Sequence, residues 1–487
     1  MPTRLLPLLL LPLFAAAAPS QAEREATYYP LVPIPIPEGI VLEAGAIQLL
    51  PDQRLAVSTR LGDIYIVSGA FDDPPDLVTF TRFASGLHEV LGLWRSPDGW
   101  IYATQRGEVT RLKDEDGDGR ADLVETVADG WGINGDYHEY AFGSKPDRDG
   151  NIWVALCLTG SFNSESLYRG WALRVTPDGR VLPTTSGLRS PGGIATNSVG
   201  DMFYTDNQGP WNGTCWLKPL TPGGFVGHPG GFRWYGQAPH LGPAPREPES
   251  GGRIATERAR IPELVPPAIA FPYNKLGQSA SGIANDHTGG KFGPFTNQLF
   301  VGDQTWSIVM RVFLEQVNGV YQGACFPFRE GFGSGSLSLE MAPDGSLFVG
   351  GTDRGWGARG GKPFSLDRLR WSGRTPFEVH EMRARPDGFE LTFTAPVDPE
   401  TAGRTAAYDF ENYTYIFQSS YGSPEVDRAK PPIEAALVAP DRRSVRLRVA
   451  LTPGHVHELK LPGVRSADGE PLLHPVAYYW LNEIPAP

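Results

Sequence analysis

A short motif recurs along the chain: an apolar strand, a Pro-Asp-Gly type turn and a second apolar strand. Proline presets φ for the first turn position and glycine accepts a positive φ, so each copy of the motif predicts a β-hairpin. The turns of the clearest copies contain Gly99, Gly150, Gly200 and Gly345, a variant follows Leu49, and a degenerate copy ends at Asp303. This repetition constrains the chain to a repeated β architecture.

Two further β-rich stretches follow each copy, so that each repeat unit contains four strands. Units of about forty to eighty residues with four strands are typical of propeller blades. Six such units fit, at residues 40–86, 87–137, 138–189, 190–263, 264–334 and 335–375. The sequence therefore predicts a six-bladed β-propeller over residues 29–375, in which segment 29–38 closes the last blade.

The pattern changes from about Phe377 onward. Strands there alternate polar and apolar residues, and short turns such as Pro386-Asp-Gly388 separate them. This alternation is typical of sheets with one buried face. We expect residues 376–487 to form an immunoglobulin-like β-sandwich that serves as an accessory domain.

The N-terminus resembles a targeting signal. Arg4 precedes an apolar run over residues 5–18, and Ser20-Gln21-Ala22 is a plausible cleavage site. The run is too short for a membrane span, and no later stretch is long enough. These features predict a signal peptide at residues 1–22 and a periplasmic or secreted protein with no membrane span.

Charge and cysteine content exclude some partners and bonds. The formal net charge is −12, which argues against a nucleic-acid partner. Three cysteines allow at most one disulfide bond within the chain. The sequence gives no indication of the oligomeric state.

One acidic loop has the spacing of a calcium site. Carboxylates stand at positions 1, 3, 5 and 9 of the loop, and position 7 offers a backbone carbonyl: Asp114, Asp116, Asp118, Asp122 and Arg120. Hard oxygen ligands at this spacing suit Ca²⁺, and four clustered carboxylates repel one another without a cation. Glu125 stands where an EF-hand has its bidentate ligand. The alternative is a solvated acidic hairpin loop. Either way, the loop joins the third and fourth strands of its unit, on the face opposite the propeller mouth.

Polar residues also converge at the propeller mouth. The inner strands are expected to begin near His138 and Arg189, and second strands to end near Asp206 and Arg354. In a propeller these positions ring the central channel on one face, which makes the ring the candidate active site. The alternative is that these residues only line a wet channel.

Three segments of the propeller carry a family resemblance. His138-Glu-Tyr-Ala-Phe-Gly, Gly187-Leu-Arg189-Ser-Pro-Gly-Gly and Gln208-Gly-Pro210 resemble, in this order, segments of the soluble quinoprotein glucose/sorbosone dehydrogenases, in particular an exported branch. The resemblance implies a sugar or aldose dehydrogenase that transfers a hydride from a sugar hydroxyl to pyrroloquinoline quinone (PQQ). It implies His138 as general base and Arg189 as the residue that contacts PQQ and stabilises its developing charge. It also implies that Gln208 and Pro210 bind a Ca²⁺ ion that holds the quinone.

Other positions depart from this family. Gly335 and Leu337 stand where the family has an arginine pair, and Gln304 replaces a lysine. Arg354 and Arg359, from the neighbouring loop, are the candidates to bind the quinone in their place. Two alternatives follow: a non-redox propeller that binds carbohydrate or protein, and a calcium-dependent lactonase-type hydrolase. In the hydrolase the metal ligands would be Glu89, Asp206, Asn207 and Asp303.

Overall fold

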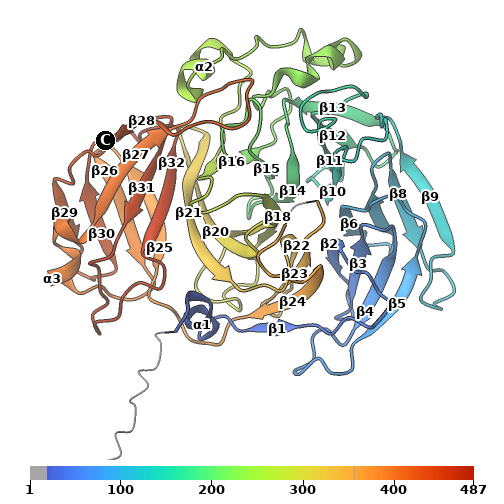
Figure 1. Ribbon diagram of the computed structural model, residues 1–487, viewed down its shortest axis with the longest axis horizontal. Coiled ribbons are helices and arrows are strands. Elements are labelled where there is room, and N and C mark those ends of the chain that lie inside the picture. The colour runs from blue at the N-terminus through green and yellow to red at the C-terminus, as the bar shows by residue number, and fades with distance from the viewer. Residues whose placement is uncertain (1–18, 356) are drawn as a thin grey trace, which may run out of the picture.

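The computed structural model describes residues 19–355 and 357–487 and shows a nearly all-β chain (Figure 1). Residues 1–18, which hold most of the predicted signal peptide, lie outside the described residues. Among the described residues, none of the helices has both the length and the apolar character needed to cross a bilayer.

Four sheets are each built from four strands that are consecutive along the chain and antiparallel. The first contains β2 (Ala44–Leu49), β3 (Leu55–Thr59), β4 (Ile64–Ser68) and β5 (Thr79–Ala84). The second contains β6 (Gly92–Arg95), β7 (Ile101–Thr104), β8 (Val109–Lys113) and β9 (Leu123–Ala128). The third contains β10 (Ala141–Pro146), β11 (Ile152–Leu156), β12 (Trp171–Val175) and β13 (Val181–Ser186). The fourth contains β14 (Pro191–Thr196), β15 (Met202–Asp206), β16 (Cys215–Pro219) and β17 (Ile269–Phe271).

The fifth and sixth sheets are modified versions of this pattern. The fifth set of strands belongs to a larger sheet and contains β18 (Ala280–Asn285), β19 (Leu299–Asp303), β20 (Ile308–Val317) and β21 (Val320–Glu330). The sixth contains β22 (Ser336–Met341), β23 (Ser346–Thr352) and β24 (Phe364–Arg370), and β1 (Leu31–Pro33) is its fourth strand. Because β1 pairs with β24, segment 29–38 does close the last sheet, and this joins the two ends of the repeat region.

The repeated turns connect the first and second strands of their sheets, as the motif predicts. Gly99 and Gly345 have φ values of 94° and 91°, which only glycine adopts without strain. One predicted boundary is wrong, however. The fourth sheet does not end at residue 263, because β17 pairs with β16 after an insertion that contains α2 (Ile254–Arg260) and two 3₁₀ helices, Pro229–Gln237 and Pro239–Leu241.

The first strands of the six sheets, which we call the inner strands, contact one another in a closed circle, as in a β-propeller. They pack so closely that side chains do not fit at several positions. A Cβ atom on Gly92 would lie 2.2 Å from the carbonyl oxygen of Gly143, and one on Gly282 would lie 2.5 Å from that of Leu337. Glycine at these positions therefore lets neighbouring inner strands approach backbone to backbone. We call the end of the circle at which the inner strands begin the mouth.

The C-terminal part forms two sheets packed against each other. One contains β25 (Val379–Arg385), β26 (Gly388–Phe393), β29 (Ala435–Val438) and β30 (Ser444–Arg448). The other contains β27 (Asp409–Thr414), β28 (Val426–Ala429), β31 (His455–Lys460) and β32 (Val476–Leu481). Strand β32 also pairs with β21, so the second sheet and the fifth propeller sheet form one eight-stranded sheet (Figure 1).

Two hydrophobic cores also contain residues from both the propeller and the C-terminal part. The core between the two C-terminal sheets includes Phe313, Ala324 and Phe326, which belong to β20 and β21. A second core joins Trp216 of the fourth sheet to Trp480 of β32, with their ring centroids 4.9 Å apart. The three cysteines are buried and unpaired. The C-terminal part thus completes its core with residues of the propeller.

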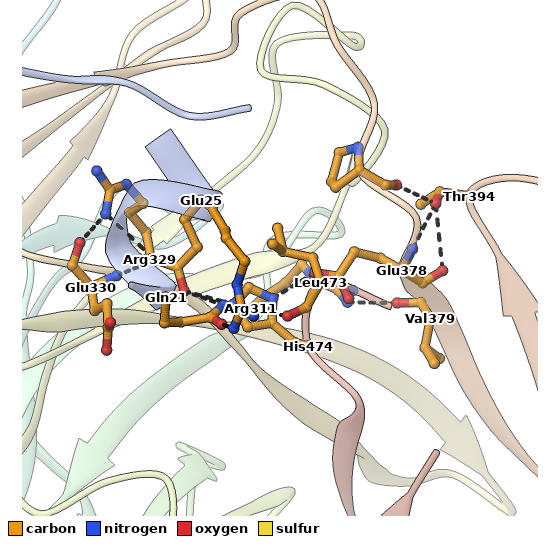
Figure 2. Close-up of polar contacts among 12 residues, drawn as sticks. Gln21, Glu25, Arg311, Arg329, Glu330, Glu378, Val379, Thr394, Leu473 and His474 are labelled. Carbon is orange, nitrogen blue, oxygen red and sulfur yellow. Dashed lines mark hydrogen bonds and ion pairs between the residues drawn. The ribbon is translucent and has the colours of Figure 1, made fainter. Parts of the chain in front are cut away.

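A buried ionic cluster ties the N-terminal helix α1 (Gln21–Ala26) to this junction (Figure 2). His474 lies between two carboxylates, with Nε2 2.7 Å from Glu25 and Nδ1 2.5 Å from Glu378. Glu25 also accepts a hydrogen bond from the backbone N–H of Glu330 in β21 and forms an ion pair with Arg329. The predicted cleavage site, Ser20 to Ala22, lies at the start of this helix, and Ser20 is its N-cap.

The two carboxylates set the charge of His474. Burial by itself lowers the pKa of His474, but the charges and hydrogen bonds of Glu378 and Glu25 outweigh it and raise the pKa to about 9. Burial raises the pKa of Glu25, yet the hydrogen bond and charge of His474 hold that pKa below its usual value. His474 is therefore an imidazolium ion at neutral pH.

We predict that His474→Ala lowers the free energy of unfolding by about 3–5 kcal/mol at pH 6, the usual cost of breaking a buried ion pair. The pKa of His474 is higher in the folded chain, about 9, than the value of about 6.5 in an unfolded one. Its stabilisation is therefore complete below pH 6.5 and is lost as the pH rises through 9. Urea unfolding at pH 6 and pH 9.5 measures the difference.

His287→Ala is the matched control, because His287 is exposed and should give a small difference that is the same at both pH values. If His474→Ala lowers the free energy of unfolding equally at pH 6 and pH 9.5, His474 stabilises the fold by packing and not by its positive charge.

Candidate functional site

A cavity of about 310 Å³ opens at the mouth. Its wall includes the starts of the inner strands with the segments that lead into them, the segments that follow the second strands, and Tyr421 from the C-terminal part. His138, Arg189 and Arg354 all line it, so the structure brings these three sequence-predicted residues together. The volume lies at the lower end of the range of about 300–1,000 Å³ that is usual for small-ligand pockets.

His138 lies just before inner strand β10 and is half-buried. Its backbone N–H donates to Asp136 Oδ1 at 2.8 Å, and its ring contacts that of Tyr137 at a tilt of 38°, with the centroids 3.9 Å apart. Burial lowers the pKa of His138 below 6.5, and the positive charges of Arg189 and Arg106 lower it further, against an opposing effect of Asp136. The imidazole is therefore neutral at neutral pH and can accept a proton.

Arg189 lies just before the next inner strand, β14, and is 5% exposed. Its Nε donates to the carbonyl oxygen of Ser161 at 3.1 Å, and its Nη1 donates to that of Asn207 at 3.4 Å. A Cβ atom on Gly209 would lie 2.1 Å from the Arg189 Nε. Glycine at position 209 is thus required for the guanidinium to occupy its place.

The opposite wall of the cavity contains few groups that bind anions. Arg354 follows β23 and is exposed, and its carbonyl oxygen accepts a hydrogen bond from Gln304 Nε2 at 2.9 Å. Gln304 is buried and held in this contact. No side chain fits at Gly335, where a Cβ atom would lie 2.3 Å from the Gln304 carbonyl oxygen, and Leu337 presents an apolar side chain. Neither position therefore presents the positive charge that the arginine pair supplies in the resembling family.

Gln208 and Pro210 do not line the cavity, contrary to the expectation that they hold a cofactor. Gln208 is buried, and its side-chain amide donates to the carbonyl oxygen of Gly213 at 3.1 Å. The C-terminal segment 416–423 covers this loop: the N–H of Gly422 donates to the Gly209 carbonyl at 3.1 Å, and that of Ser423 to Gly213 at 3.0 Å. The covering segment therefore packs on the loop that contains Gln208 and Pro210.

The same segment adds a residue to the cavity that sequence reasoning missed. The Tyr421 ring lies 5.3 Å from the guanidinium carbon of Arg189, and Phe162, from the loop after β11, lies 6.0 Å from it. Both rings are about half exposed and line the cavity. The available signal was an aromatic residue in a Gly-Ser loop, but only the folded chain brings position 421 to the mouth.

The carboxylates proposed as hydrolase ligands have structural roles instead. Asp206 accepts the Ser190 N–H at 2.7 Å and Lys218 Nζ at 2.9 Å. Asp303 accepts the N–H groups of Gln278 and Ser279 at 2.6 and 2.7 Å, and burial raises its pKa despite these bonds. Glu89 forms an ion pair with Arg106. These side chains hold the starts of their inner strands and do not gather into a metal site.

The acidic loop between β8 and β9 lies at the other end of its sheet. Oxygen atoms of Asp114, Asp116 and Asp122 lie within 4.8 Å of one another. In the described part of the chain, no other three acidic, histidine or cysteine side chains come this close. Asp118 is outside this group, and its Oδ1 accepts the N–H of Arg120 at 2.8 Å. Glu125 is turned away, because it forms an ion pair with Arg111 on the neighbouring strand.

The sequence matches a known family over much of the repeat region. Residues 73–332 match a family described as a domain of unknown function, DUF7133, and this is more than half of the 487 residues. The chain belongs to the DUF7133 family. No curated protein matches its sequence.

Solved structures resemble this DUF7133 protein in fold. A carbohydrate-active enzyme of family AA12 from Trichoderma reesei is 14% identical, with a TM-score of 0.50, and the match covers 71% of this chain and 96% of that one. A calcium structure from the same family is 13% identical, with a TM-score of 0.49 and coverage of 71% and 96%. The PQQ-bound aldose sugar dehydrogenase of Streptomyces coelicolor is 16% identical, with a TM-score of 0.49 and coverage of 70% and 98%. At these identities the likeness concerns the fold alone.

We predict that the pKa of His138 in this DUF7133 protein lies below 6.5, and that Arg189→Gln raises it toward 6.5 because one nearby positive charge is removed. Asp136→Asn should lower it further, since Asp136 favours the imidazolium. An NMR titration of the His138 ring protons measures all three values.

Arg180→Gln is the control for charge removal, since the Arg180 side chain is 70% exposed and lies in a turn at the other end of the third sheet. A wild-type pKa above 6.5, or one that Arg189→Gln leaves unchanged, would show that the guanidinium does not act on this imidazole.

Proposed function

We propose that the mouth cavity binds a small sugar-class molecule, and that the protein is a sugar dehydrogenase-like protein of the DUF7133 family. The observation that carries this proposal is the convergence of His138 and Arg189, from successive sheets, on one cavity. Aromatic rings at Phe162 and Tyr421 lie beside them. A concave site that combines aromatic faces with a few fixed polar groups suits a molecule with both C–H faces and hydroxyl groups.

We propose that His138 accepts a proton at this site as a general base. Its neutral imidazole has the protonation state that a general base needs to take the proton of a sugar hydroxyl. Because its pKa is lowered, this form persists at pH values below 6.5. Arg189 provides a fixed positive charge beside it.

The residues present do not fit PQQ as the resembling dehydrogenases hold it. Gly335, Leu337 and Gln304 offer no positive charge to its carboxylates, and the segment 416–423 covers the loop that contains Gln208 and Pro210. Arg189 also lies against Gly209, so a guanidinium already stands beside the loop expected to bind Ca²⁺. PQQ-dependent oxidation of a sugar is therefore the second candidate, favoured by the pairing of His138 with Arg189.

The finer architectural features are also proposals. We interpret the six sheets as six blades that end near residue 375, and the two C-terminal sheets as an immunoglobulin-like sandwich. We propose that residues 1–22 are a signal peptide, which would place the protein in the periplasm or outside the cell. Its partner would be a small sugar, with no nucleic acid.

A panel of neutral and acidic monosaccharides tests the proposed function. We expect at least one member to bind to the wild-type chain in isothermal titration calorimetry. Phe162→Ala should weaken that binding about tenfold, because the aromatic wall of the cavity is removed. Leu77→Ala, at a position that is 84% exposed and remote from the mouth, is the matched control.

When the wild-type protein is titrated with PQQ in the presence of Ca²⁺, it should not bind PQQ with a micromolar dissociation constant. Binding of PQQ would instead favour the second candidate, in which His138→Ala lowers dye-linked sugar oxidation by about 10²–10⁴. If no sugar of the panel binds to the wild type, the sugar-binding proposal fails. If a sugar binds equally well to Phe162→Ala and to the wild type, that sugar does not bind in the mouth cavity as proposed.

We also propose that the loop Asp114 to Asp122 binds Ca²⁺ in a structural role, with Asp114, Asp116 and Asp122 as its carboxylate ligands. Their oxygens are close enough to share one ion, and a cation relieves their mutual repulsion. A chelator should therefore lower the melting temperature by about 2–4 °C. Asp116→Asn should abolish the response to the chelator.

Asp149→Asn, in an exposed turn of the third sheet, should leave the response to the chelator intact. Identical melting curves with and without chelator in the wild type would identify the loop as a solvated hairpin.

A further inference from the structure

The positive and negative charges of the side chains that line the cavity do not balance. Glu43 pairs with Arg60 at 2.8 Å, and Glu89 pairs with Arg106, so neither carboxylate is available to the cavity centre. His138 is neutral because its pKa is lowered. Among the described residues, no carboxylate lies within ion-pair distance of the two remaining cations, Arg189 and Arg354. The cavity thus carries an excess of positive charge.

Arg189 differs from the other buried arginines in its bonding. Arg169, which is fully buried, donates four hydrogen bonds to backbone carbonyl oxygens. Arg189 donates two, although a guanidinium has five N–H groups. Arg189 lines the cavity, and its nitrogen atoms are not among the buried side-chain atoms that lack a partner, so its remaining N–H groups can donate to an acceptor in the cavity.

The surroundings of Arg189 favour one kind of acceptor. The rings of Tyr421 and Phe162 contact the guanidinium, and cation–π contacts leave its in-plane N–H groups for hydrogen bonds. A carboxylate accepts two such bonds side by side. Arg354, from the sixth sheet, lines the same cavity and adds a second positive charge.

We propose that the ligand of the mouth cavity is an acidic monosaccharide, such as a hexuronate, whose carboxylate is bound by Arg189 and attracted by Arg354. This inference rests on the proposed function and adds the substrate class. A cavity of about 310 Å³ suits a single sugar ring. The hydroxyl groups of the ring would then face His138, and the C–H faces would contact Phe162 and Tyr421.

Calorimetry with D-glucuronate, D-glucose and D-glucose 6-phosphate tests the proposal. We expect glucuronate to bind at least about tenfold more tightly than glucose, and more tightly than the phosphate ester. Arg189→Gln should weaken glucuronate binding about 10- to 100-fold, as expected for a lost charge-assisted hydrogen bond, and should weaken glucose binding by a smaller factor, because glucose has no carboxylate to lose that bond.

Arg354→Gln keeps the test decisive if Arg189→Gln does not fold. The Arg354 side chain is exposed and, among the described residues, makes no ion pair or side-chain hydrogen bond, so its loss should not disturb the fold. Arg354→Gln should weaken glucuronate binding several-fold and leave the affinity for glucose unchanged, because glucose carries no charge for Arg354 to attract. Arg180→Gln, remote from the mouth, should bind glucuronate as the wild type does.

Equal binding of glucose and glucuronate would overturn the acidic-sugar proposal and leave the sugar-binding function standing. Tighter binding of glucose 6-phosphate would overturn the assignment of a carboxylate. Failure of all three sugars to bind would overturn this inference, and the proposed function would fail as well only if no member of the monosaccharide panel binds.

Discussion

The pairing of β21 with β32 is the contact on which the rest of the molecule depends. It joins a propeller sheet and a C-terminal sheet into one eight-stranded sheet, so both parts share a hydrogen-bond ladder. The long hairpin β20–β21 supplies apolar side chains to the C-terminal core, and Trp480 packs on Trp216 in return. With its edge and core shared in this way, the C-terminal part has a fixed orientation on the propeller.

That orientation determines what the mouth contains. Segment 416–423 lies against the loop 207–213 through backbone hydrogen bonds, and this places the ring of Tyr421 near Arg189. The contact covers Gln208 and adds an aromatic wall to the cavity. One docking contact therefore both removes the expected ion-binding loop from the site and contributes a new side chain to it. The cluster around His474 strengthens the same junction, because it connects α1, β21 and the C-terminal sheets.

The polar residues of the mouth divide into two groups by their partners. Asp206, Asp303 and Glu89 lie where sequence reasoning expected them, but backbone N–H groups or cationic side chains already satisfy them. Arg189 and Arg354 have no carboxylate partner among the described residues. A polar residue at a strand end serves the fold when its bonds are satisfied internally, and it can serve a ligand when they are not.

Local physics made much of the fold predictable from the sequence. A Pro-Asp-Gly turn between two apolar strands closes a hairpin wherever it occurs, so the repeat, the all-β class and the pairing of segment 29–38 with the last sheet could be predicted. His138 and Arg189 could be placed at the mouth because each stands just before an inner strand. The boundary at residue 263 was wrong because an insertion of irregular structure hides a three-residue strand, β17, which only its pairing with β16 defines.

Tertiary structure alone decided the character of the site. The bonds of Asp206 and Asp303, the burial of Gln208 and the arrival of Tyr421 at the cavity all depend on residues distant in the sequence. The spacing of the acidic loop suggested four carboxylate ligands and one carbonyl, with Glu125 at the position of a further ligand. Strand pairing turned Glu125 toward Arg111, and three of the four carboxylates lie together, without Asp118. Local sequence thus determined which elements form and where polar side chains emerge. Long-range packing determined which of those side chains still have hydrogen bonds to offer a ligand.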